Sequence, residues 1–108
     1  MITVSAVVAR VRVVDAATLE AWVSQEWVRP RREGGRPVFE EVDVARVRLI
    51  VELRDALAVE EESIPVVLDL LDQLHATRGE LGRLLAALDA AGDTPARTVM
   101  AVFADRVR

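Results

Sequence analysis

The chain has 108 residues, of which 52% are apolar, and its formal net charge is −4. This length predicts one domain with a modest core. The sequence has no cysteine, which excludes disulfides and thiolate metal sites. It also has no run of about 18 apolar residues and no signal-peptide pattern, so we expect a cytoplasmic protein.

The charge is distributed unevenly along the chain. Residues 29–36 contain four Arg and one Glu, a sum of +3, whereas residues 40–72 contain ten acidic residues and three Arg, a sum of −7. A protein that binds mainly to phosphates is usually basic overall. The acidic segment therefore favours a basic protein partner at least as readily as nucleic acid. A solvated surface of mixed charge would produce the same pattern.

The N-terminal segment, residues 2–14, is rich in β-branched residues. Such residues favour a pleated, half-buried surface, so the segment is predicted to be a strand. Its expected partner is the hairpin near Gly34 and Gly35, which would give a three-stranded sheet. A swap onto a second subunit would satisfy the same strand edge.

A short helix is predicted over residues 16–25, with Asp15 or Thr18 as its N-cap. Its apolar residues follow helical spacing and predict a buried stripe: Leu19, Trp22, Val23 and Trp27. Tryptophans can stack on bases in proteins that bind single strands. At this spacing beside a hairpin, a role in the core is the favoured interpretation.

Residues 27–39, WVRPRREGGRPVF, have the pattern of a β-hairpin. Gly34 and Gly35 can adopt the positive φ angles of a tight turn. Pro30 and Pro37 are tolerated at strand ends or on an edge strand, where an N–H group is not needed. A helix, a basic hairpin and a second helix make the layout of a winged helix.

The next helix is predicted from Asp43 to about Ala58, with a buried face formed by Val44, Val47, Ile50, Val51, Leu53 and Leu57. Glu60–Glu62 and Pro65 then open another helix. Acidic residues and proline are both favoured in a first turn, which explains these residues without a functional role. A partner-binding site is the alternative interpretation.

The helix that follows has the most regular pattern in the chain, a seven-residue repeat of Val67, Leu74, Leu81 and Leu88. A chain of this size offers little to cover such a row, and each fully buried Leu contributes roughly 1.5–3 kcal/mol. We therefore predict a homodimer that packs through this row. The predicted organisation is a winged-helix part, residues 1–58, and a helical dimerisation and partner-binding part, residues 59–108, in one compact domain.

The remaining segments offer no catalytic constellation. Thr94 and Pro95 predict the start of a final helix that ends near Val107. His75 is the only histidine, and with no cysteine a metal site is not expected. We find no nucleophile with a nearby base and no Gly-rich phosphate loop. The sequence therefore predicts a protein that is not an enzyme and needs no cofactor.

From about residue 19 to residue 88, the order of segments resembles the MerR family. That family has a short helix ending in G-L/V-x-P, a wing closed by an aromatic residue, and an Asp-capped helix. The matching residues are Val28 and Pro30, then Phe39, then Asp43, Val44, Val47 and Ile50. The later run, LRDALAV followed by IPVVLDLLDQL, is similar to the small CbpM-type chaperone modulators.

This resemblance implies a mainly α fold with a small β-sheet. It would comprise a truncated winged helix with the N-terminal strand and wing hairpin, a long dimer-type helix and a short C-terminal helix. It also implies a function, because CbpM-type proteins bind the J-domain of a DnaJ-like co-chaperone and inhibit it. J-domains present a basic helix to Hsp70, and an acidic surface would complement it. The candidate partner-binding residues are therefore Glu60, Glu61, Glu62, Asp69 and Asp72.

The sequence departs from a DNA-binding MerR domain in two respects. The segment before Asp15 is predicted to be a strand, so the first helix of the helix-turn-helix would be missing. The recognition segment, residues 19–26, has two acidic residues and no Arg or Lys. DNA binding is therefore disfavoured. The alternative function, a DNA-binding regulator of stress genes, depends on phosphate contacts by Arg29, Arg31, Arg32 and Arg36.

Overall fold

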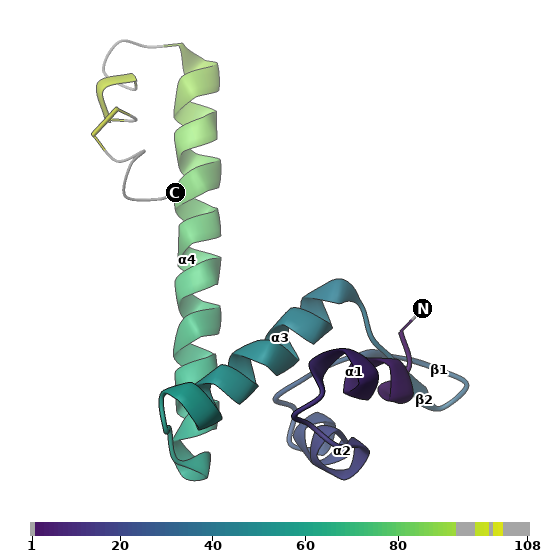
Figure 1. Cartoon of the computed structure of the whole chain (residues 1–108). Helices are drawn as coiled ribbons and strands as arrows, with labels where there is room; N and C mark the ends of the chain where they lie inside the picture. Colours follow the sequence, from purple (N-terminus) through teal and green to yellow (C-terminus); the bar gives the residue numbers. More distant parts are fainter. Residues whose placement is uncertain (1, 93–96, 100, 103–108) are drawn as a thin grey trace. The chain divides into compact units, whose positions relative to one another are not determined.

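A computed structural model describes residues 2–92, 97–99 and 101–102 of the chain. The fold is mainly helical with one small antiparallel sheet, as predicted (Figure 1). The chain divides into two compact units, of which the first ends at Val66 and the second begins at Val67.

The chain begins with a helix, α1 (Val4–Val11), so the predicted strand over residues 2–14 is wrong. The Thr3 hydroxyl caps this helix by accepting a hydrogen bond of 3.2 Å from the Ala6 N–H. Its valines follow the helical repeat i, i+3, i+4, i+7, and Val7 is fully buried. Valine is less favourable than alanine in a helix by only a few tenths of a kcal/mol, so burial of this face outweighs the β preference.

The hairpin consists of β1 (Arg31–Glu33) and β2 (Arg36–Val38), with Arg32 opposite Pro37 in the register. Gly34 and Gly35 form its turn with φ angles of 58° and 79°, as their sequence predicts. The predicted third strand is replaced by an isolated bridge, in which the Phe39 N–H donates to the Ile2 carbonyl at 2.8 Å. No N-terminal strand therefore remains in the described chain for a swap between subunits.

The second helix, α2 (Ala16–Ser24), lies close to the predicted bounds. Asp15 is its N-cap, because its Oδ1 accepts a hydrogen bond of 2.8 Å from the Thr18 N–H. This bond also lowers the pKa of the Asp15 carboxyl below its ordinary value. Trp22 and Trp27 are only 5% and 6% exposed, and their ring centroids lie 6.2 Å apart. The prediction that both belong to the core is confirmed.

The third helix, α3 (Glu41–Val51), begins two residues before the predicted cap Asp43. Asp43 instead lies in the first turn and accepts a hydrogen bond of 2.8 Å from the Glu40 N–H, as in a capping box. The helix continues as a π-helical turn, η1 (Glu52–Ala56). Leu57 lies beyond it and is 65% exposed, so its predicted place on the buried face is wrong.

The core of the first unit lies where α1 contacts α2 and α3 and where the hairpin closes onto them. Its buried side chains are all apolar: Val7, Val14, Leu19, Trp22, Trp27, Val28, Val38, Phe39, Val44, Val47, Ile50, Leu53 and Ile64. At the surface, Arg10 of α1 and Glu41 of α3 form a bidentate ion pair with N–O distances of 2.9 and 2.8 Å. This pair ties α1 to α3.

Three helical segments are followed by a residue that has a positive φ angle although it is not glycine. Arg12 follows α1, Glu26 follows α2, and Ala58 follows η1, with φ angles of 57°, 63° and 51°. Side chains with a Cβ are disfavoured in this region. All three residues are exposed, so the fold accepts a local conformational cost at these turns.

The last part of the chain begins with a single 3₁₀ turn, η2 (Glu61–Ser63), and the long helix α4 (Ile64–Ala91). Pro65 lies in the first turn of α4, where its missing N–H has no partner to lose, as predicted. Gly92 follows the helix with a φ of 73°, which is typical of a helix end. Most of the predicted final helix, residues 95–107, lies outside the described residues.

Candidate functional site

The helices α1 and α2 form a complete helix-turn-helix. Residues 12–15 separate them, a connection of the length found in this motif. The prediction that the first helix is missing is therefore wrong, because it depended on assigning residues 2–14 to a strand. With the hairpin β1–β2 following α2, the first unit is a winged helix.

The exposed face of α2 carries little that could read DNA bases. Its solvent-facing residues are small or polar: Ala16, Ala17, Glu20, Ala21 and Ser24. Glu20 is the only charged residue of the helix. A recognition helix usually presents Arg, Lys, Asn or Gln to base edges, and a carboxylate is repelled by the phosphates that border the groove. Gln25, just beyond the helix, is the one exposed amide nearby.

The four candidate nucleic-acid residues lie on or beside the hairpin, and all are exposed. Arg31 is paired with Glu40 at 3.3 Å and with Glu33 at 3.8 Å. Arg32 donates a hydrogen bond of 3.3 Å to the carbonyl of Gly35. The side chains of Arg29 and Arg36 make no hydrogen bond or ion pair within the residues that the structure describes. Because side chains alternate along a strand, Arg31 and Arg36 lie on one face of the hairpin and Arg32 on the other, while Arg29 precedes the hairpin.

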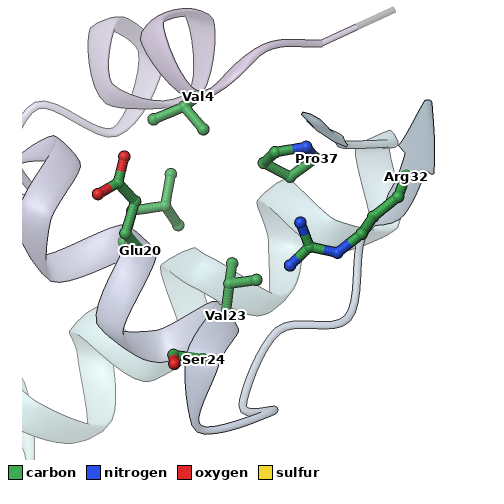
Figure 2. Close-up of a pocket in the computed structure, with 7 residues that line it drawn as sticks. Val4, Glu20, Val23, Ser24, Arg32 and Pro37 are labelled. Atoms are coloured by element: carbon green, nitrogen blue, oxygen red, sulfur yellow. The ribbon is translucent and has the colours of Figure 1, made fainter. Parts of the chain in front are cut away.

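A cavity of about 310 Å³ opens between α2 and the hairpin (Figure 2). Its lining is mostly apolar, with a carboxylate and a guanidinium at its edges: Val4, Leu19, Glu20, Val23, Ser24, Arg32 and Pro37. In Figure 2, Glu20 lies on the α2 side and Arg32 on the hairpin side, with Val23 and Pro37 between them. The lining residues belong to α1, α2 and the hairpin, so they are far apart in the sequence and no local motif predicts this cavity.

A second cavity, of about 380 Å³, lies beside the tryptophan pair and includes Glu61 in its lining. Arg54 covers this side of Trp22, with its guanidinium carbon 5.6 Å from the ring centroid. Arg54 is also bonded to Asp55 at 2.7 Å, which raises the pKa of Arg54 and lowers that of Asp55. Because the Arg54 guanidinium already covers the Trp22 ring, this cavity is poorly suited to bind a second cation.

The predicted acidic surface is exposed in each of its parts. Glu60, Glu61 and Glu62 belong to the first unit and lie at the turn before α4. Asp69 and Asp72 belong to the second unit and lie on α4, where Asp69 accepts a hydrogen bond of 2.8 Å from Gln73. The candidate surface therefore consists of a glutamate run and a separate pair of aspartates.

The helix α4 exposes a row of apolar side chains. Leu74 and Leu81 of the predicted dimer interface are 44% and 41% exposed, while Val67 and Leu88 are half-buried. More strongly exposed residues extend the same face: Val66 at 60%, Leu70 at 59% and Leu84 at 55%. The seven-residue repeat thus identifies part of a wider apolar face that is exposed in the described chain.

A family model described as MerR HTH family regulatory protein matches residues 2–85. The chain belongs to this family. The match covers α1, α2, the hairpin, α3 and most of α4. The comparison with curated proteins and the comparison with solved structures find no match.

Over the described ranges, no three His, Cys, Asp or Glu residues gather as metal ligands would. His75 is exposed on α4. None of the helices described is long and apolar enough to cross a membrane.

Proposed function

We propose that this MerR-family protein is a chaperone modulator that binds the J-domain of a DnaJ-like co-chaperone and inhibits its activity. The observation that carries the proposal is the exposed face of α2. This face would enter the major groove in a DNA-binding relative, yet it presents Glu20 and no Arg or Lys. A face of this composition suits a protein surface better than a nucleic acid.

The partner-binding residues in this proposal are the acidic ones. Glu60, Glu61 and Glu62 are exposed and consecutive, and none of them has an ion-pair partner within the described part of the chain. A basic helix, such as a J-domain uses to meet Hsp70, would be attracted to this run. Binding there would inhibit the co-chaperone by occupying the surface that Hsp70 needs. We place this binding in the cytoplasm.

The proposal includes a homodimer formed through α4. The exposed face that includes Leu70, Leu74, Leu81 and Leu84 has no cover within the chain as described. Burial against the same face of a second copy would remove this apolar surface from water. A dimer would carry two glutamate runs and would therefore offer two binding sites for J-domains.

The test is a titration of the purified protein with the J-domains of the DnaJ-like proteins of its own host. We expect saturable binding that the double variant Glu60→Lys/Glu62→Lys weakens by about tenfold or more, because charge reversal replaces attraction with repulsion. The matched control is Glu80→Lys/Asp89→Lys, which makes the same change in net charge at exposed positions on α4. Equal binding by both variants would contradict the assigned site, and no binding by the unchanged protein would contradict the function.

Two observations support a second candidate function, a DNA-binding regulator of stress genes. The helix-turn-helix is complete, and Arg29 and Arg36 are exposed with no ion-pair partner in the described chain. The test is a titration with duplex DNA from the upstream region of its own gene at two salt concentrations. Sequence-selective binding that weakens with salt and with Arg29→Gln/Arg36→Gln would establish this function in place of the first.

A further inference from the structure

We propose that the groove between α2 and the hairpin is a docking site for a peptide segment of a protein partner. The segment would place an apolar side chain in the cavity, a cationic residue beside Glu20 and a carboxylate beside Arg32. This inference deepens the proposed function in one respect, namely that the partner is a protein, and it names a surface distinct from the glutamate run.

The shape of the groove suits a chain segment. The cavity of about 310 Å³ is floored by Val4, Leu19, Val23 and Pro37. A second hollow of about 290 Å³ shares Val4 and Pro37 with it and continues past Thr3 and Ser5 to Arg36. The two hollows are therefore adjacent, and together they are the groove of this proposal. A single apolar side chain fits one hollow, and the neighbouring residues of the same segment have room in the next.

The walls of the groove come from three elements that the fold holds in place. Arg32 and Pro37 are opposite each other in the hairpin register, so both side chains lie on one face of the hairpin. Val4 belongs to the first turn of α1, which Thr3 caps. Val23 and Glu20 are three residues apart on α2 and therefore share one face of that helix. The groove is thus built on capped helices and a paired hairpin.

Two charged residues line the groove, Glu20 on α2 and Arg32 on the hairpin, and they predict which charges the bound segment carries. Glu20 has no ion pair within the described residues. The only side-chain hydrogen bond described for Arg32 goes to the Gly35 carbonyl, so its guanidinium has no carboxylate partner there. Figure 2 shows the Arg32 guanidinium pointing inward from the hairpin side and the Glu20 carboxylate on the α2 side. A segment with a cation, an apolar residue and a carboxylate complements both sides at once.

A DNA duplex matches this groove poorly. Its phosphates would meet the Glu20 carboxylate, and Val4 and Val23 offer no hydrogen-bonding groups to bases. A protein segment meets both requirements, because it can present an apolar side chain and opposite charges within a few residues.

The first experiment follows the methyl groups of Val4, Leu19 and Val23 by NMR in the full chain. The probes are the J-domain used above and the end-blocked peptide Arg-Ala-Leu-Ala-Glu. We expect saturable shifts of these methyl signals and smaller shifts with Arg-Ala-Ser-Ala-Glu or Gln-Ala-Leu-Ala-Gln. The first control peptide lacks the apolar side chain, and the second lacks both charges.

The second experiment fills the groove with Val23→Arg and compares it with Val13→Arg. Val13 is 60% exposed and does not line the groove, so it provides a matched control. We expect Val23→Arg to weaken J-domain binding by about tenfold and Val13→Arg by less than about twofold, on the scale of single interface residues. Tryptophan fluorescence verifies that both variants fold.

The outcomes separate this inference from the proposed function. If the J-domain binds but neither it nor the peptide shifts the groove methyl signals, the groove is excluded and the modulator function stands. If the J-domain does not bind but the peptide shifts them in a charge-dependent way, the groove stands and the modulator function fails. Shifts caused only by duplex DNA, or by no probe, overturn the inference.

Discussion

The first unit and the helix α4 use their apolar residues in opposite ways. In the first unit, valines and aromatic residues such as Val7, Val47 and Phe39 are at most 1% exposed. On α4, Leu70, Leu74, Leu81 and Leu84 are all more than 40% exposed. The winged helix therefore buries its hydrophobic residues within the chain, and α4 buries Ile64 and Leu68 at its start but leaves these four leucines exposed.

The largest expected effect comes from removing the centre of the winged-helix core. Phe39 is 1% exposed and adjoins the wing and the N-terminal bridge. We expect Phe39→Ala to lower the free energy of unfolding by about 3–5 kcal/mol, through lost burial and the cavity left behind. Urea unfolding followed by tryptophan fluorescence measures this directly, because Trp22 and Trp27, the only tryptophans, both belong to the first unit. A loss below about 1 kcal/mol would contradict this account of the core.

The second prediction tests the other side of the comparison. We expect Leu70→Asp/Leu81→Asp to convert a dimer into a monomer, because carboxylates are costly to bury across the paired faces. Sedimentation velocity over a range of concentrations measures the change in mass. The tryptophan-detected unfolding of the first unit should change little, and a large destabilisation there would show that these leucines serve the folded chain itself. A monomeric unchanged protein would exclude the dimer.

A smaller effect is expected where Arg54 covers Trp22. The guanidinium lies over the ring at 5.6 Å and its side chain is 36% exposed. Removing it with Arg54→Ala should cost about 0.5–1 kcal/mol of stability, the range for exposed cation–π contacts. The same substitution should shift the tryptophan emission, because Trp22 loses its cover. Asp55→Ala is the control, since it removes the ion pair and leaves the cation over the ring.

The smallest effect concerns the surface pair that ties α1 to α3. The hydrogen bond from Arg10 lowers the pKa of the Glu41 carboxyl and raises that of the guanidinium. A carboxyl with a lowered folded-state pKa stabilises the fold above its ordinary pKa of about 4.3. That stabilisation is lost as the pH falls through the lower folded-state value. We expect urea midpoints measured from pH 6 down to pH 2 to fall less steeply in Glu41→Gln than in the unchanged protein.

Most of the fold follows from patterns in the sequence. Asp15 predicts the start of α2, Gly34 and Gly35 predict the turn, and the apolar spacing of α3 predicts its buried face. The N-terminal helix was misassigned because its valines have high β preference. The spacing of Val4, Val7, Val8 and Val11, together with Thr3 as a cap, contained the helical signal, and tertiary burial decides between the two patterns.

The functional surfaces are less predictable from sequence. The leucine repeat of α4 is visible in the sequence because it lies within one helix, and so is the glutamate run. The groove is different, because Val4, Glu20, Arg32 and Pro37 come from three separate elements. Only the packing of α1, α2 and the hairpin brings them together. The strand assignment for residues 2–14 would also have placed Val4 in the wrong element.

The three residues with positive φ that follow helical segments are positions where the stability of this protein can be raised by substitution. Arg12, Glu26 and Ala58 each have a positive φ that glycine adopts without the Cβ clash. Natural sequences are rarely optimised beyond the threshold that their function requires. Replacing these residues by glycine would remove the Cβ clash at the three turns. A variant stabilised in this way would stay folded when a second substitution lowers its free energy of unfolding. Binding could then be measured in variants that would otherwise unfold.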